Sequence, residues 1–287
     1  MKRVGVLVIL LGCFASAAWA QQTQSATKPN VTVAKPLVLY DNFNGPRIDP
    51  AKWVGTWGDT SDLLETVREL VPTLQGEGNN RYLRLSLDSY APTFSDYGGI
   101  GGGFGLNFST PASITETSFT VTVRAAKAVG CETNPSQDVA VAEFRGRFFN
   151  TESSPTSELG DIEGEIGVNR YSTDTGPALL VSAFYTRCDD DSCGARTTLD
   201  FKELGYVYPG QPAKLRAKWD QPNHRFIFQL NHDPEFISPY AVSDQNPPYY
   251  GAWRSIALTR VLPNCTSTPR PEAMMDAYFD NVYVNAQ

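Results

Sequence analysis

Apolar and polar residues alternate in short runs along most of the chain. Because neighbouring side chains of a β-strand point to opposite faces, an alternation with a period of two predicts half-buried strands. The runs lie at residues 37–40, 82–87, 118–124, 139–149, 179–185, 214–219, 225–230 and 277–284. This pattern predicts an all-β protein.

Turn-forming residues separate these runs. Residues 220–224 (Asp-Gln-Pro-Asn-His) predict a hairpin turn that joins residues 214–219 to residues 225–230. Residues 61–70 fit a helix or a strand about equally well. Many strands with few helices predict an antiparallel β-sandwich of two sheets. We expect residues 36–287 to form a single domain, since sandwiches of this length are common.

The first 20 residues have the features of a secretory signal peptide. Lys2 and Arg3 precede an apolar run at residues 4–14, and Ala-Trp-Ala at residues 18–20 fits a cleavage site with small residues. The apolar run is shorter than the ~20 residues that span a membrane. We therefore expect a secreted or periplasmic protein with no transmembrane segment.

Two further features lie near the N-terminus. Residues 10–13 (Leu-Leu-Gly-Cys) loosely resemble a lipobox, so a lipid anchor at Cys13 is an alternative to cleavage further along the chain. Residues 21–35 are rich in Gln, Thr, Ser and Ala, which predicts a flexible leader before the folded domain.

Cleavage after residue 20 leaves four cysteines, namely Cys131, Cys188, Cys193 and Cys265. An even number in an exported chain indicates two disulfides, and four cysteines allow three pairings. Cys188 and Cys193 flank a short acidic stretch, so a local bridge forms easily. That choice leaves Cys131 and Cys265 for a long-range bridge.

The overall charge excludes one class of partner. The chain has 24 Lys and Arg against 31 Asp and Glu, for a net charge of −7. A protein that binds nucleic acid through phosphates needs clustered basic residues. We therefore expect no nucleic-acid partner.

Three stretches carry a resemblance to a known family. These are residues 37–53 (Leu-Val-Leu-Tyr-Asp-Asn-Phe-Asn-Gly-Pro-Arg-Ile-Asp-Pro-Ala-Lys-Trp), the hairpin at residues 214–230, and the ending at residues 278–284 (Tyr-Phe-Asp-Asn-Val-Tyr-Val). They resemble the concanavalin A-like jelly rolls, which include laminin G-like domains, legume-type lectins and family-16 glycoside hydrolases. The resemblance implies a jelly-roll sandwich, and such motifs specify fold better than function.

Three acidic residues alternate at residues 160–167 (Gly-Asp-Ile-Glu-Gly-Glu-Ile-Gly). On a strand, Asp161, Glu163 and Glu165 would share one face. Glycoside hydrolysis uses two carboxyl groups, and neighbouring carboxylates raise one another's pKa. A solvated strand face and a metal site are the alternative interpretations of this row.

The row is similar to the E-x-D-x-E motif of family-16 hydrolases. That resemblance would make Asp161 the nucleophile, Glu163 the assisting residue and Glu165 the acid/base. The sequence departs from the motif because Asp161 replaces the first Glu and Glu163 replaces the central Asp. The Trp-rich stretch that precedes the motif in the family is also missing.

Other residues are candidates for ligand contacts. Tyr249, Tyr250 and Trp253 follow two prolines in an irregular region, and sugars stack on aromatic rings. We include these three residues and Trp57 as candidate carbohydrate-binding residues. The resemblance also implies a structural calcium ion, because first and last strands are often neighbours in this fold. Asp41 and Asp280 are the candidate ligands.

Three functions remain open from the sequence. The first is an exported protein that binds an extracellular polysaccharide or glycan on a concave sheet without catalysis. The second is an endo-acting retaining glycoside hydrolase that uses Asp161, Glu163 and Glu165. The third is an envelope or surface protein whose partner is another protein.

Overall fold

The computed structural model describes residues 36–54, 63–72, 81–92, 95–135 and 138–285. The expected signal peptide and leader lie outside these residues, so export, the lipid anchor at Cys13 and the domain start at residue 36 remain predictions. Within the described residues, no helix is long and apolar enough to cross a membrane. The helical segments there are two short 3-10 turns, η1 (Pro111–Ser113) and η2 (Gln221–Asn223).

Eight strands form one sheet in the order β13-β12-β11-β6-β15-β4-β3, with β1 paired to β15. They are β1 (Leu37–Asp41), β3 (Leu63–Pro72), β4 (Arg81–Tyr90), β6 (Glu116–Val129), β11 (Ala213–Asp220), β12 (Arg225–Leu230), β13 (Phe236–Pro239) and β15 (Glu272–Asn285). Strand β15 pairs with β6, β4 and β1. The first and last described strands are therefore neighbours.

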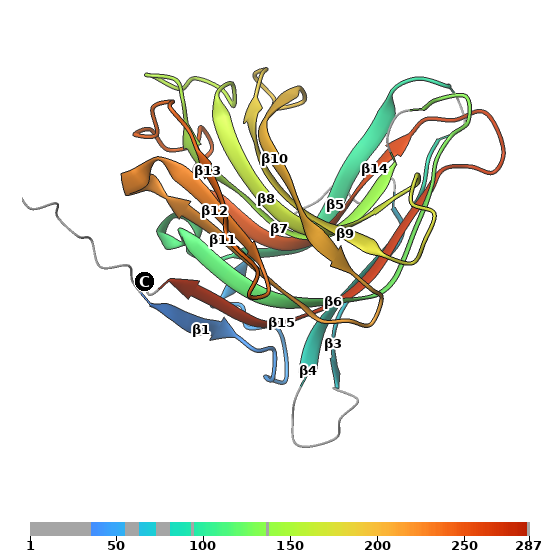
Figure 1. Ribbon diagram of the computed structural model, residues 1–287, viewed down its shortest axis with the longest axis horizontal. Coiled ribbons are helices and arrows are strands. Elements are labelled where there is room, and N and C mark those ends of the chain that lie inside the picture. Colours follow the sequence, from blue (N-terminus) through green and yellow to red (C-terminus); the bar gives the residue numbers. More distant parts are fainter. Residues whose placement is uncertain (1–35, 55–62, 73–80, 93–94, 136–137, 286–287) are drawn as a thin grey trace, which may run out of the picture. The chain divides into compact units, whose positions relative to one another are not determined.

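Seven strands form the second sheet in the order β10-β9-β8-β7-β14-β5-β2. They are β2 (Trp53–Val54), β5 (Gly99–Phe108), β7 (Val139–Asn150), β8 (Asp161–Tyr171), β9 (Leu179–Cys188), β10 (Arg196–Val207) and β14 (Trp253–Pro263). The described strand pairs in both sheets are antiparallel, and Figure 1 shows the two layers. The predicted all-β, antiparallel sandwich of two sheets is confirmed.

The strands follow the alternation in the sequence. Each predicted run lies within or overlaps an observed strand, and residues 63–70 of the ambiguous segment form part of strand β3. The predicted hairpin forms between β11 and β12. Its turn ends at His224, which has a left-handed backbone (φ 49°) that allows the chain to reverse direction.

The core lies between the two sheets. Leu83, Leu85 and Leu87 alternate along β4 and are fully buried. Phe144 on β7 and Ile166 on β8 are buried in the same core from the second sheet. Full burial of one such side chain contributes about 1.5–3 kcal/mol to folding. The inward residues of both sheets therefore account for the cohesion of the sandwich, and the outward residues are available for other roles.

Two disulfides have the pairing favoured by the sequence. Cys188 bonds to Cys193, and Cys131 bonds to Cys265 across 134 residues. The local bridge closes the tip between β9 and β10, where the Asp190 carboxylate accepts the backbone N–H of Ser192, Gly194 and Ala195. Disulfides fit a protein of an oxidising compartment.

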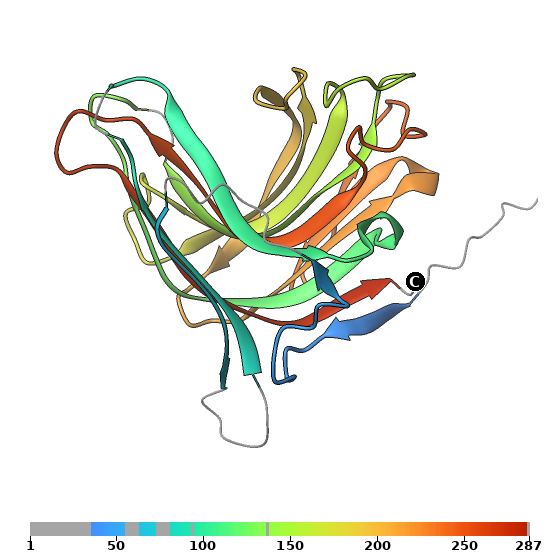
Figure 2. The same cartoon turned by 180° about the vertical axis from the view of Figure 1, so that it is seen from behind.

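Glycines allow β5 to lie close to β14. A Cβ atom on Gly103 or Gly105 would lie 2.2 Å from a backbone oxygen of β14. Any larger residue would push the two strands apart. Figure 2, which shows the molecule from behind, makes the long, bent course of β5 visible.

Candidate functional site

Strand β8 carries the row of acidic residues. Ile162 and Ile166 belong to the core, and Gly164 faces two core phenylalanines. Because side chains alternate along a strand, Asp161, Glu163 and Glu165 lie on the opposite, outward face of the seven-stranded sheet. The neighbouring strands then decide the surroundings of each carboxyl group.

Glu163 is the centre of an ion-pair network. Its carboxylate lies 2.7 Å from Nε of Arg147, 3.0 Å from Nη2 of Arg145 and 3.5 Å from Nε of Arg196. The side chain is almost completely buried, and burial alone would raise the pKa of Glu163. The three guanidinium groups overcome this effect and lower the pKa, so the carboxylate is ionised.

Asp161 is fully buried. Its carboxylate accepts hydrogen bonds from Nδ2 of Asn150 at 2.6 Å and from the backbone N–H of Tyr249 at 3.1 Å, and it pairs with Arg147 at 3.3 Å. Burial raises its pKa, and these partners oppose the rise. The contacts tie the start of β8 to the loop before β14.

Glu165 has the opposite electrostatic environment to Glu163. Its partner is Glu143, which is fully buried on β7, one diagonal position away in the strand register. Burial and the negative charge of Glu143 raise the pKa of Glu165 well above its usual value. Glu165 therefore holds its proton more tightly than a carboxyl group in water does.

A cavity of about 620 Å³ lies over this face of the sheet. Its lining comes from β7, β8, β9 and β10 on one side and from β5 and β14 on the other, the two sides that Figure 1 shows diverging. The residues that line it are Gly101, Gly102, Val139, Val141, Arg145, Glu163, Gly164, Glu165, Asn169, Tyr171, Phe184, Thr186, Cys193, Gly194, Arg196, Thr198, Phe201, Thr259, Arg260 and Val261. We call this cavity the groove.

Two rows of paired residues cross the floor and one wall of the groove. The strand register places Thr198 opposite Thr186 and Thr186 opposite Glu163. In the next row, Phe201 lies opposite Phe184, and Phe184 lies opposite Glu165. The groove thus presents hydroxyl groups, two aromatic rings with centroids 6.3 Å apart, the ionised carboxylate of Glu163 and the carboxyl group of Glu165, whose pKa is raised.

The predicted aromatic residues lie outside the lining of the groove. Tyr249 and Tyr250 have ring centroids 4.6 Å apart and are exposed, Tyr250 to 77%. The guanidinium of Arg145 lies 5.5 Å from the ring centre of Trp253, which connects this residue to the groove. Trp57 falls outside the described residues.

Asp41 and Asp280 lie near each other because β1 pairs with β15. The carboxylate of Asp41 accepts N–H bonds from Phe43 at 2.9 Å and from the Trp53 indole at 2.7 Å. Asp280 accepts the backbone and side-chain N–H groups of Asn281. Calcium takes six to eight oxygen ligands. Asp41 and Asp280 would supply two carboxylates of such a set, so calcium at this position stays a prediction.

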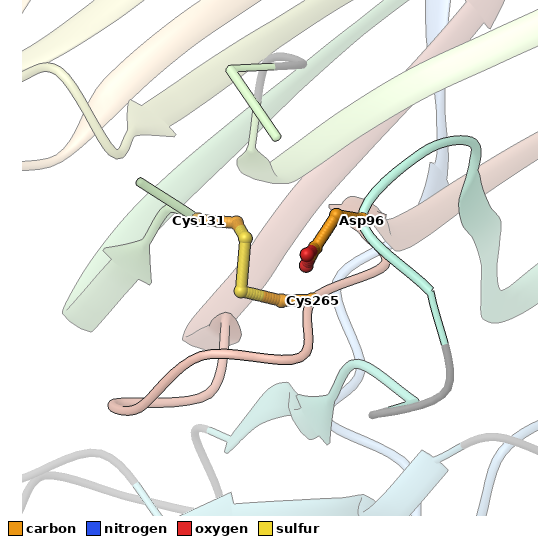
Figure 3. A group of neighbouring side chains, drawn as sticks. All are labelled: Asp96, Cys131 and Cys265. Atoms are coloured by element: carbon orange, nitrogen blue, oxygen red, sulfur yellow. A yellow bond between two sulfur atoms is a disulfide. The ribbon is translucent and has the colours of Figure 1, made fainter. Parts of the chain in front are cut away.

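Two groups of residues in the described part of the chain have metal-ligand spacing. One is Asp96 with Cys131 and Cys265, drawn in Figure 3, and the other is Glu163 with Cys188 and Cys193. Each group contains a disulfide, whose sulfur atoms are no longer thiolates that bind metals. Neither group fits a metal ion.

The sequence analysis missed Glu143, Arg145, Arg147 and Arg196 as site residues. Glu143, Arg145 and Arg147 alternate on β7 just as the acidic row alternates on β8. That spacing was visible in the sequence, but the pairing of β7 with β8 was not. Arg196 follows the disulfide loop, and no motif or spacing in the sequence marks it as a site residue.

Comparisons with known proteins give a distant likeness only. No protein-family model and no curated protein match the chain. LamAcat from Zobellia galactanivorans is 11% identical, with a TM-score of 0.39, over 89% of this chain and 98% of that one. A family-16 endo-glucanase from Bacteroides ovatus is 9% identical, with a TM-score of 0.34, over 85% and 98%. Lectin II from Ulex europaeus is 12% identical, with a TM-score of 0.29, over 79% and 97%.

The concanavalin A-like resemblance inferred from the sequence is matched by a weak structural likeness of this kind, which carries no further argument. Identities this low say nothing about ligand or activity, because one fold serves many functions. The function has to be argued from the groove itself.

Proposed function

We propose that the chain binds a glycan in the groove of the seven-stranded sheet without cleaving it. The observation that supports this proposal is the composition of the groove, which combines aromatic rings, hydroxyl groups and charged groups in a cavity of about 620 Å³. Small-molecule sites have this size and this mixture of apolar walls and few polar groups. The fold alone does not specify a ligand, so the proposal depends on the residues of the groove.

The wall formed by β9 and β10 suits a sugar ring. Phe201 is 46% exposed and lies beside Phe184, so an aromatic surface faces the groove. Sugars bury their apolar faces on such rings. Thr186 and Thr198 lie opposite each other in the adjacent row and can bond to sugar hydroxyls.

Burial of Asp161 supports binding over hydrolysis. In the motif match this residue would be the nucleophile, but it is fully buried and does not line the groove. Its oxygens are held by Asn150, Arg147 and the Tyr249 backbone. A nucleophile must reach its target atom, and a displacement of ~1 Å already costs about a hundredfold in rate.

The loop that carries Tyr249, Tyr250 and Trp253 is a candidate extension of the binding surface. It is anchored to β8 through the bond from Tyr249 to Asp161. The exposed ring of Tyr250 and the contact of Trp253 with Arg145 support a role for these aromatic residues beyond the end of the groove. Asp161 would then act by positioning this loop.

Affinity electrophoresis on a panel of polysaccharides tests the proposal. Phe201→Ala removes an exposed ring from the groove, and Tyr206→Ala removes an exposed ring from the same strand outside the groove lining. We expect Phe201→Ala to weaken binding about tenfold and the Tyr206 variant to bind normally. Equal binding by both variants would place the ligand elsewhere. Failure to retain any polysaccharide would favour the protein-partner alternative.

One observation favours the hydrolase as a second candidate. Glu163 and Glu165 are two residues apart on one face, and their environments shift their pKa values in opposite directions. Pairs of this kind mark acid and base roles in enzymes. Reducing-sugar release on the same panel tests it, with Asp161→Asn and Glu165→Gln as separate variants. Release that requires Glu165 would establish hydrolysis, and loss in the Asp161 variant as well would restore the original assignment.

A further inference from the structure

Arg196 is the most exposed of the charged residues that line the groove. Its side chain is 40% exposed, against 13% for Arg145 and 6% for Glu163. It donates from Nε to Sγ of Cys193 at 3.2 Å, and the same Nε lies 3.5 Å from Glu163. The structure gives its two Nη groups no bond to any described residue.

The position of Arg196 is fixed by the chain around it. It begins β10, directly after the loop that the Cys188–Cys193 disulfide closes. Asp190 holds this loop through three backbone N–H groups, which lower the pKa of Asp190 to about 2. The guanidinium is therefore held at the groove before any ligand arrives, so binding costs less conformational entropy.

Among the charged residues that line the groove, Arg196 is the one open to a ligand. Arg260 lines the groove, but its side chain reaches between the sheets to Ser89 on β4. Arg145 is tied to Glu143 and Glu163. Burial and the charge of Glu143 raise the pKa of Glu165, which favours its uncharged form. The charge that a ligand meets is thus that of Arg196, in a chain whose net charge is −7.

We propose that the glycan bound in the groove carries a carboxylate or a sulfate group, and that Arg196 pairs with this group through its Nη atoms. This inference rests on the proposed glycan-binding function. A guanidinium binds both anions with two parallel N–H bonds, and such charge-assisted bonds are stronger than neutral ones. The Phe184–Phe201 rings and the two threonines would contact the sugar beside the anion.

Matched pairs of polymers provide the probes. Alginate and pectate carry carboxylates, and their carboxyl-reduced forms are neutral. Carrageenan and dextran sulfate carry sulfates, and desulfated carrageenan and dextran are their neutral counterparts. Binding is measured at 0.15 M salt, where the Debye length is about 8 Å, so that diffuse attraction is screened. We expect at least one acidic polymer to bind more than tenfold more tightly than its neutral form.

Two substitutions that remove the same charge separate specific from diffuse binding. Arg196→Gln removes the proposed contact, and Arg187→Gln removes an exposed arginine of β9 that pairs with Asp189 and does not line the groove. We expect Arg196→Gln to weaken acidic-polymer binding 10- to 100-fold and Arg187→Gln to have little effect. Arg196→Lys keeps the charge without the bidentate geometry, so we expect an intermediate loss.

The outcomes distinguish this inference from the proposed function. Preference for an acidic polymer, lost in Arg196→Gln alone, would support it, and the polymer that binds identifies carboxylate or sulfate as the anion. Equal binding of acidic and neutral forms would overturn it and leave glycan binding intact. An equal loss in both variants would show diffuse attraction and also overturn it. Binding to no polymer at all would overturn the glycan proposal as well.

Discussion

Polar residues alternate in the same way on the outward faces of the two sheets, but their side chains are exposed to different extents. On the eight-stranded sheet, Arg84 pairs with Glu69 and Asp276, and these side chains are 15–44% exposed. On the seven-stranded sheet, Arg147 pairs with Glu163, and both side chains are less than 10% exposed. Alternation therefore predicts which face a residue occupies and does not predict whether water reaches it.

The two faces differ in side-chain exposure because one of them is hollowed into the groove. The groove face lies between strands that diverge on two sides, so neighbouring side chains exclude water from the floor. Charges there must be matched by protein groups, whereas charges on the open face are matched by solvent.

The largest effect is expected where a buried carboxylate is removed. Glu163→Gln leaves Arg145, Arg147 and Arg196 without their shared negative charge. We expect it to lower the free energy of unfolding by about 3–5 kcal/mol. Asp276→Asn on the open face should cost no more than about 1 kcal/mol. Denaturant titration measures both, and similar losses would contradict the contrast between the faces.

A smaller effect concerns pH. The folded-state pKa of Glu165 is raised, so its protonated form stabilises the fold below the unfolded-state pKa near 4.5. That contribution is lost as pH rises through the folded-state pKa. Glu165→Gln should flatten this decline, so that the variant gains stability relative to the parent chain as pH rises from 5 to 8.

The matched control for this prediction is Glu69→Gln. Glu69 is exposed on the other sheet, so its substitution makes the same chemical change away from the groove. Thermal unfolding at several pH values gives the profiles. An unaltered profile in the Glu165 variant would contradict the carboxyl pairing with Glu143.

The smallest effect is expected on the open face. Arg124 lies 5.1 Å from the ring centre of Tyr278 and donates to its hydroxyl. Because the pair is in contact with water, Arg124→Ala should cost about 0.5 kcal/mol. Differential scanning calorimetry would show a shift of roughly 1–2 °C in Tm for a domain of this size. A shift of more than 5 °C would mean that this face is less solvated than its exposure indicates.

Much of the fold could be predicted because its signals are local. The alternation on β4, the turn before Arg225 and the pairing of Cys188 with Cys193 depend on residues close in the chain. The acidic row was also visible as a spacing of two. The partners of that row were not, because Arg145 and Arg196 come from β7 and from the start of β10.

From the sequence alone we could predict that strands form, which side chains face outward, and that three carboxyl groups share one strand. The burial of Asp161, the lowered pKa of Glu163 and the raised pKa of Glu165 come from the tertiary structure. The reason is physical. The ionisation of a carboxyl group depends on its burial and on charges within a few ångströms, and both are set by the register of strands far apart in the chain.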